Sequence, residues 1–273
     1  DREPIVRVAA IQMNSGADPD QNLQLAAKLL GDAARDGCTL AVLPENFALM
    51  PQRGRDKSRY AEPPGTGPIQ DFLADIAVKH GMWIVGGSMP LASPEPERVY
   101  GACIVVDDQG NEEAIYRKIH LFDVDLPDGE ESYRESHSMY AGDDPTAVDT
   151  PAGRVGLTIC YDVRFPELYR TLVDDGATVF TIPAAFTAVT GAAHWHTLLR
   201  ARAIENLAYV IAPGQFGTHP DNRKTYGHSL IVDPWGRILA EQPSGNCAVV
   251  ADIDPGAPDK LRASFPALAN RRL

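Results

Sequence analysis

Short runs of apolar residues recur along the 273-residue chain, and amphipathic segments with helical spacing separate them. The runs are nearly continuous rather than alternating, which is typical of strands whose two faces are both buried. Six of these runs occupy residues 5–13, 39–43, 82–86, 155–159, 177–182 and 208–212. The pattern therefore predicts an α/β protein whose sheets are covered on both faces.

The helices are predicted from apolar positions three and four residues apart and from the signals at the helix ends. Asp18 and Pro19 supply an N-cap and a proline at the first turn, and Gly37 ends the same helix. Further helices are predicted over residues 69–80, 166–175 and 191–206.

Two predicted hairpins interrupt the alternation of strands and helices. Residues 99–106 are expected to pair with 113–117, and residues 226–232 with 237–241 across a turn of type I character. Hairpins add antiparallel strands, so the sheets should be mixed. No repeat or low-complexity segment divides the chain, and we expect one domain over residues 1–273.

Composition narrows the classes of function. Apolar residues make up 44% of the chain, enough for a large core. The net charge is -12 and no basic run occurs, which argues against nucleic acid as a partner. No apolar stretch reaches about 18 residues, so no membrane span is expected. The N-terminal residues lack the apolar segment of a secretory signal.

The cysteines indicate a reducing compartment. The chain has four of them, far apart and without a C-x-x-C pair, at Cys38, Cys103, Cys160 and Cys247. This spacing argues against a zinc ribbon and against a disulfide framework. We therefore expect reduced thiols and a cytoplasmic protein.

Three reactive side chains each follow an apolar strand. Cys160 comes after the run 155–159, Glu45 after 39–43 and Lys118 after the strand at 113–117. Open α/β sheets place their chemistry beyond the carboxyl ends of strands. Each residue also has a structural alternative: a buried small hydrophobe for the cysteine, a helix N-terminal charge for the glutamate, and a strand-end side chain that reaches solvent for the lysine.

Together the three residues could attack a carbonyl or nitrile carbon. A thiol needs a base to become a nucleophile, and Glu45 can be that base. A carboxylate normally has a pKa of about 4.3 and would be too weak a base, so we expect burial to raise the pKa of Glu45. Lys118 can donate to the oxyanion, a role worth roughly 2.7–4 kcal/mol, and the backbone N–H of Tyr161 would be a second donor.

The blocks around these residues resemble the catalytic blocks of the nitrilase superfamily of carbon–nitrogen hydrolases. They are Leu43-Pro44-Glu45, residues 116–123 and residues 160–167. Further segments resemble the Nit branch of that superfamily and extend the likeness over nearly the whole chain: residues 190–195, 199–206, 226–229 and 232–236. The resemblance implies a four-layer αββα sandwich with two mixed β-sheets, and pairing into dimers through the outer helix layer.

The resemblance also implies a role for each site residue. Glu45 is the general base, Lys118 stabilises the oxyanion and Cys160 is the nucleophile. Glu135 matches the second glutamate of the family, which supports Lys118 and the attacking water, and Glu131 is the alternative for this role.

Substrate recognition is assigned to three more residues. Arg164 matches a residue that contacts carboxylate-bearing substrates, although a salt bridge to Asp162 or Glu167 is an equal alternative. Phe186 and Thr187, in the loop 184–191, are also assigned to substrate binding.

No metal or organic cofactor is implied. The pair His194 and His196 could suggest a metal site, but no carboxylate or cysteine ligand is evident beside it. Asp162 and His228 are expected to brace the site or an interface.

The predicted function is a cysteine-dependent amidase for a small carboxylate-bearing amide, with deaminated glutathione as the first choice and 2-oxoglutaramate as the second. Its intermediate would be a thioester. A nitrilase or an N-carbamoyl amino acid hydrolase is the alternative within the superfamily. Alternatives of another class are a non-catalytic interaction protein and a redox sensor at Cys160.

Overall fold

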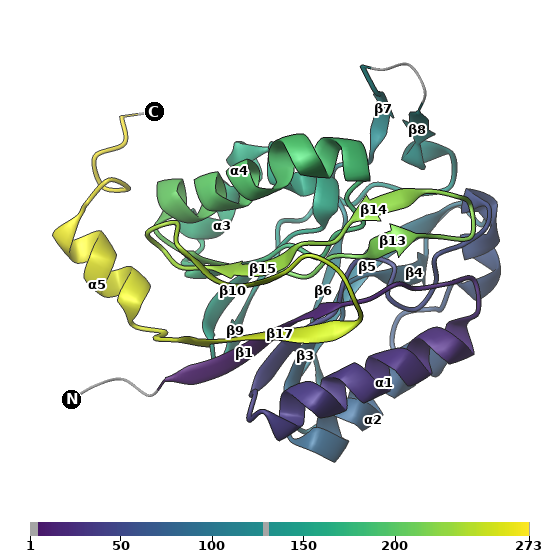
Figure 1. The fold of residues 1–273 in the computed structure, drawn as a ribbon, viewed down its shortest axis with the longest axis horizontal. Helices are drawn as coiled ribbons and strands as arrows, with labels where there is room; N and C mark the ends of the chain where they lie inside the picture. Colours follow the sequence, from purple (N-terminus) through teal and green to yellow (C-terminus); the bar gives the residue numbers. More distant parts are fainter. Residues whose placement is uncertain (1–4, 128–130, 273) are drawn as a thin grey trace.

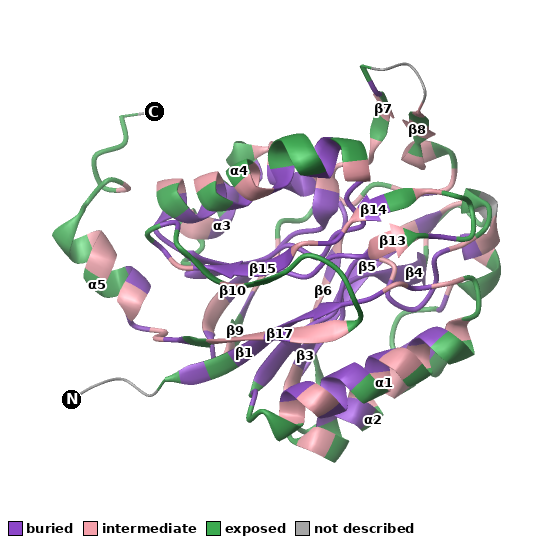
Figure 2. Ribbon diagram, in the orientation of Figure 1, coloured by how far each residue is buried: buried purple, intermediate pink, exposed green. Residues whose placement is uncertain are grey.

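Two β-sheets lie face to face at the centre of the computed structural model, which describes residues 5–127 and 131–272 (Figure 1). A pair of helices covers the outer face of each sheet, and the layer order is αββα. Buried residues concentrate on the strands, and the helices are exposed on their outer sides (Figure 2). The predicted sandwich with two mixed sheets is confirmed.

The first sheet has seven strands and contains the first and the last strand of the fold. Its parallel centre is β1 (Val6–Gln12), β2 (Leu40–Val42) and β3 (Trp83–Val85). The antiparallel neighbours are β17 (Cys247–Ile253), β5 (Val99–Val106), β4 (Met89–Ala92) and β6 (Glu112–Arg117). β5 and β6 form the first of the two predicted hairpins.

The second sheet has six strands and repeats this plan of a parallel centre with antiparallel flanks. The parallel strands are β10 (Gly153–Leu157), β11 (Val179–Thr181) and β12 (Tyr209–Ala212). The flanking strands are β9 (Ala147–Thr150), β15 (Ser229–Val232) and β16 (Ile238–Gln242). β15 and β16 form the second predicted hairpin.

Helices complete the outer layers. The first sheet is covered by α1 (Pro19–Arg35) and α2 (Pro68–His80), and the second by α3 (Pro166–Asp174) and α4 (Ala188–Asn206). The short helix α5 (Ala257–Ser264) follows the last strand. Within the described part of the chain, no helix combines the length and the apolar character that a membrane span requires.

Strand β1 shows why the apolar runs are continuous. Val8 and Ala10 pack into the core cluster between the sheets, whereas Ala9 and Ile11 pack into the cluster under α1 and α2. All four side chains are fully buried. Alternate residues of a strand point to opposite faces, so a strand with two covered faces needs apolar residues at every position.

The helix starts differ slightly from the predictions. Asp18 caps α1 as predicted, and its carboxylate accepts hydrogen bonds from the N–H groups of Asp20 and Gln21. Helix α4 begins at Ala188, three residues before the predicted start, because Thr187 is its N-cap and accepts from the Thr190 N–H. A threonine N-cap inside an apolar loop gave no periodic signal.

The segment 123–145 shows neither a strand nor a helix pattern in its sequence, but it contains regular structure. Strands β7 (Asp123–Asp125) and β8 (Ser132–Arg134) pair, and a 3₁₀ helix at Glu135–His137 follows them. A second small hairpin joins β13 (Phe216–Thr218) and β14 (Lys224–Tyr226). Both hairpins are too short and too polar to show the alternation expected of strands.

Gly87 permits a close approach of the backbone next to Glu45. Its φ is +56°, a left-handed conformation that favours glycine. A β-carbon at this position would overlap the carbonyl oxygens of Pro44 and Leu43. The residues directly before Glu45 can therefore keep their position only if residue 87 has no side chain.

Substitution of Gly87 by Ala is expected to destabilise the protein and displace Glu45. Gly81→Ala is the matched control, since Gly81 has a φ of +58° and no atom within 4 Å of an added β-carbon. The control should cost about 1–2 kcal/mol, the cost of a left-handed residue. Gly87→Ala should cost roughly 1–3 kcal/mol more, because of the added overlap. Equal loss of the free energy of unfolding in both variants would contradict this account.

Candidate active site

Glu45, Lys118 and Cys160 come from both sheets and line one cavity of about 250 Å³. Glu45 follows β2 of the first sheet, and Lys118 follows β6 of the same sheet. Cys160 follows β10 of the second sheet and begins the 3₁₀ helix Cys160–Arg164. The structure thus brings together the three residues that the sequence placed at strand ends.

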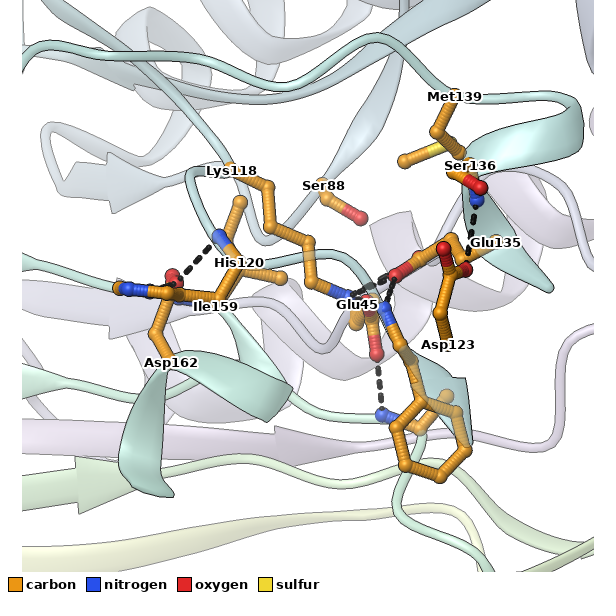
Figure 3. Close-up of polar contacts among 12 residues, drawn as sticks. Glu45, Ser88, Lys118, His120, Asp123, Glu135, Ser136, Met139, Ile159 and Asp162 are labelled. Carbon is orange, nitrogen blue, oxygen red and sulfur yellow. Dashed lines mark hydrogen bonds and ion pairs between the residues drawn. The ribbon is translucent and has the colours of Figure 1, made fainter. Parts of the chain in front are cut away.

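Lys118 is held between two carboxylates, as Figure 3 shows. Its Nζ donates to Glu45 Oε1 at 2.8 Å and to the two oxygens of Glu135 at 3.0 and 2.9 Å. The lysine is 2% exposed. Burial alone would lower its pKa, but the charges of Glu135 and Glu45 raise the pKa well above its ordinary value. Lys118 is therefore a fixed cation.

Glu135, rather than Glu131, is the glutamate that reaches Lys118. Its carboxylate also accepts a hydrogen bond from the Phe122 N–H at 2.6 Å. Glu131 instead accepts from the hydroxyl of Tyr133 at 2.6 Å. Glu135 is presented by the 3₁₀ helix that follows β8, an element that the sequence did not predict.

Glu45 is buried and held at both carboxylate oxygens. Besides the bond to Lys118, its Oε2 accepts from the Ala185 N–H at 2.8 Å, and Gln215 donates to its backbone oxygen. Burial raises its pKa as expected, but the charge and hydrogen bond of Lys118 and the charge of Lys57 act in the opposite direction. The pKa of Glu45 lies below its ordinary value, so the predicted direction was wrong.

Cys160 has a strained backbone at the start of its 3₁₀ helix. Its φ is +49°, which is uncommon for a residue with a side chain. Its N–H donates to the carbonyl of Pro183 at 2.8 Å. Burial raises the pKa of its thiol well above the ordinary value, as do the charge and hydrogen bond of Glu45, while Lys118 opposes the shift. The resting pair is a neutral thiol beside a charged carboxylate.

Tyr161 is the second residue of the 3₁₀ helix and lines the cavity beside Cys160. The first N–H groups of a helix have no partner within that helix. This position agrees with the predicted role of its N–H as an oxyanion donor, which stays a prediction.

Asp162 connects the segment of Cys160 to that of Lys118. Its fully buried carboxylate accepts from the Tyr116 hydroxyl at 2.7 Å, from the Ile159 N–H at 2.8 Å and from the His120 N–H at 3.1 Å. Figure 3 shows the contact with His120. Because a buried group that loses its partner costs about 1–3 kcal/mol, this carboxylate strongly fixes the spacing of the two segments.

The three residues assigned to substrate binding occupy different places. Phe186 and Thr187 line the cavity, and both are buried. Arg164 is not among the described residues that line it. Its guanidinium lies over the Phe186 ring at 5.2 Å and contacts His194 Nδ1 at 3.3 Å. Among the described ion pairs, none joins Arg164 to Asp162 or Glu167, which were the alternative partners.

Lys57 and Arg223 are two cations of the cavity that the sequence did not single out. Lys57, in the 3₁₀ helix Gly54–Tyr60, is buried and donates to Asn46 Oδ1 at 2.9 Å. Arg223 lies directly before β14 and has its guanidinium over the Tyr133 ring at 5.1 Å. Each lies in a polar loop without periodicity, so nothing in the sequence distinguished it from a solvated surface cation.

A histidine cluster lies outside this cavity. His196 Nε2 and His228 Nδ1 both contact Glu241 Oε1, at 2.8 and 2.6 Å. The expectation that no carboxylate accompanies His196 was wrong, since β16 brings Glu241 to it. These three side chains could hold a divalent cation. None of them lines the cavity of Cys160.

Comparisons with known proteins agree with this site. The carbon–nitrogen hydrolase family matches residues 7–262. The deaminated glutathione amidase of Yersinia enterocolitica is 40% identical over 97% of this chain and 92% of its own. That of Synechocystis sp. is 43% identical over 96% and 97%. The crystal structure of Saccharomyces cerevisiae Nit3, a member of branch 10 of the nitrilase superfamily, has a TM-score of 0.88 at 33% identity and covers 100% of this chain and 98% of Nit3.

The chain therefore belongs to the carbon–nitrogen hydrolase family of the nitrilase superfamily. It is an enzyme that hydrolyses the carbon–nitrogen bond of amides. The predicted resemblance to the Nit branch is confirmed by these relatives.

Replacement of Glu45 by Gln should have opposite effects on thiol reactivity and on turnover. The substitution removes the charge that raises the pKa of Cys160 and leaves Lys118, which lowers it. Alkylation of Cys160 by iodoacetamide at neutral pH should therefore become faster. Amide hydrolysis should fall by about 10²–10⁴-fold, the loss expected if Glu45 is the general base that the sequence predicts.

The alkylation rate against pH, followed by mass spectrometry of the peptide that contains Cys160, measures this effect. Lys118→Met is the control of opposite sign, since it should raise the thiol pKa further and slow alkylation. Slower alkylation in the Glu45→Gln protein would show that the electrostatic assignment is wrong.

Proposed function

We propose that this enzyme is a cysteine-dependent amidase that hydrolyses deaminated glutathione through a thioester intermediate. The observation that carries the proposal is the buried Lys118 between Glu45 and Glu135, in one cavity with the Cys160 thiol. The names of the relatives from Yersinia enterocolitica and Synechocystis sp. support the substrate.

The first half of the reaction is acylation. The sulfur of Cys160 attacks the amide carbon while its proton moves to Glu45, and the carbonyl electron pair moves to oxygen. Lys118 Nζ and the Tyr161 N–H would stabilise that oxyanion. Because Glu45 is charged and the thiol is neutral at rest, attack and proton transfer should occur together. Glu45 then protonates the nitrogen, the carbon–nitrogen bond breaks and the amine leaves.

The second half is hydrolysis of the thioester. Glu45 takes a proton from water as the water oxygen attacks the acyl carbon, and the same oxyanion donors act again. The carbon–sulfur bond breaks, the carboxylic acid is released and the proton returns to the sulfur. Glu135 would keep Lys118 in place through both halves, since its two oxygens accept from the ammonium.

We also propose that the enzyme pairs with a second copy through the outer layer of α3 and α4. Apolar side chains on that layer and beside it are exposed: Val189, Ile204, Trp235, Ile238 and Leu239. A monomer in sedimentation experiments would contradict this pairing.

We also propose a reducing, cytoplasmic location. The cysteines described are all free thiols, which supports it.

The proposed function is tested by product release from a panel of substrates: deaminated glutathione, 2-oxoglutaramate, an N-carbamoyl amino acid and a simple nitrile. We expect the first amide to give the highest kcat/KM. Cys160→Ala should fold normally and release no product, because the nucleophile is absent. Preference for the nitrile or the carbamoyl compound would replace the proposed reaction by one of the alternatives. Undiminished turnover in the Cys160→Ala protein would exclude the cysteine mechanism.

A further inference from the structure

Arg223 presents an incompletely paired guanidinium to the catalytic cavity. It lies at the end of the turn between β13 and β14, two strands that are labelled in Figure 1. Its side chain lines the same cavity as Cys160. Its Nε is buried and makes no hydrogen bond to any described residue. This nitrogen forms an ion pair with the carboxylate of Asp221, which also lines the cavity, at 3.5 Å. Guanidinium groups at this kind of site bind carboxylates in a two-pronged arrangement.

The other arginine of the cavity has no such free capacity. Both oxygens of Asp125 accept hydrogen bonds from Arg134 Nη2 at 2.9 Å. Nη1 of the same arginine donates to two backbone carbonyls. Arg134 therefore differs from Arg223 in being occupied by the protein itself, which makes it a suitable control.

Lys57 lines the same cavity as Arg223 and adds a second cation. Its ammonium donates to the neutral Asn46 Oδ1, and no ion pair within 4.0 Å joins it to a described carboxylate. Burial lowers its pKa, Glu135 and Glu45 raise it, and the charge of Arg223 lowers it further. Both cations line the same cavity, where a bound anion would reduce the repulsion between their charges.

The position of Lys57 indicates which part of the substrate would bind there. In the proposed reaction Glu45 protonates the departing amine, so the amine half of the substrate lies on the side of Glu45. Lys57 Nζ donates to Asn46, the residue directly after Glu45, and both residues line the cavity, so Lys57 lies on this side. Arg164 packs on Phe186 and His194 instead, outside the lining of the cavity.

We propose that Arg223 and Lys57 form an anion subsite for the carboxylate of the amine half of the substrate. The inference rests on the proposed amidase function and deepens it. In deaminated glutathione the amine half is cysteinylglycine, whose glycine carboxylate would bind at this subsite. In 2-oxoglutaramate the leaving group is ammonia, and the subsite would contribute nothing. The two cations would therefore favour the larger amide.

The test compares deaminated glutathione with its C-terminal carboxamide, which lacks only the charge. The unmodified enzyme should prefer the acid by about 10- to 100-fold in kcat/KM, the range for a hydrogen bond to a charged group. In Arg223→Met this preference should largely disappear, mainly through KM, because the bond is made equally in the ground and transition states. The loss with 2-oxoglutaramate should be much smaller.

Arg134→Met is the matched control and should retain the preference for the acid over the carboxamide. Arg223→Lys keeps the positive charge but cannot form the two parallel hydrogen bonds of a guanidinium, so it should retain part of the preference. Equal kcat/KM for acid and carboxamide in the unmodified enzyme, or an unchanged preference in Arg223→Met, would overturn the subsite.

A binding experiment separates this inference from the proposed function. Calorimetric titration with cysteinylglycine and with its C-terminal amide requires no turnover. The unmodified protein should bind the acid more tightly, and Arg223→Met should bind both alike. If no amide of the panel is hydrolysed, the function fails while this titration still decides the subsite. Equal binding of acid and amide to the unmodified protein would remove the subsite even from an active amidase.

Discussion

The buried ammonium of Lys118 is the constraint on which the rest of the site depends. Moving one charge from water into a protein costs several kcal/mol, even after relaxation. Lys118 is 2% exposed, so it needs the carboxylates of Glu45 and Glu135 at hydrogen-bond distance. Removing one partner of a buried pair costs about 3–5 kcal/mol. The ends of β2 and β6 and the turn after β8 are therefore held together by the same contacts that would stabilise an oxyanion.

Charge balance and bracing complete this arrangement. Lys118 contacts the carboxylates of Glu45 and Glu135, and the charge of the buried Lys57 also lowers the pKa of Glu45. The positive charges of Lys118 and Lys57 keep Glu45 ionised, while burial keeps the thiol of Cys160 protonated. Asp162 joins the segments of Cys160 and Lys118 through buried hydrogen bonds. A neutral thiol beside a charged carboxylate is a stable resting state, from which the proposed reaction would start once a carbonyl reaches Lys118.

Much of this arrangement could be predicted from the sequence. The rest could not, for physical reasons that differ from residue to residue. Continuous apolar runs identified the doubly covered strands, and the polar residues at their ends included Glu45, Lys118 and Cys160. Lys57 and Arg223 escaped notice because they lie in polar loops, far in sequence from the residues they approach. The pKa of Glu45 had the wrong predicted sign because it depends on cations from two distant segments. Glu241 came to His196 only through the pairing of β15 with β16.

The most direct test of the central claim is to trap the acyl group during turnover. The enzyme is mixed with deaminated glutathione, quenched with acid within the first turnovers, digested and mapped by mass spectrometry. The account predicts an acyl group on the peptide that contains Cys160, removable by hydroxylamine as expected of a thioester, and none on Cys38, Cys103 or Cys247. Continued product release with no acyl group on Cys160, under conditions in which a thioester standard survives the quench, would contradict it.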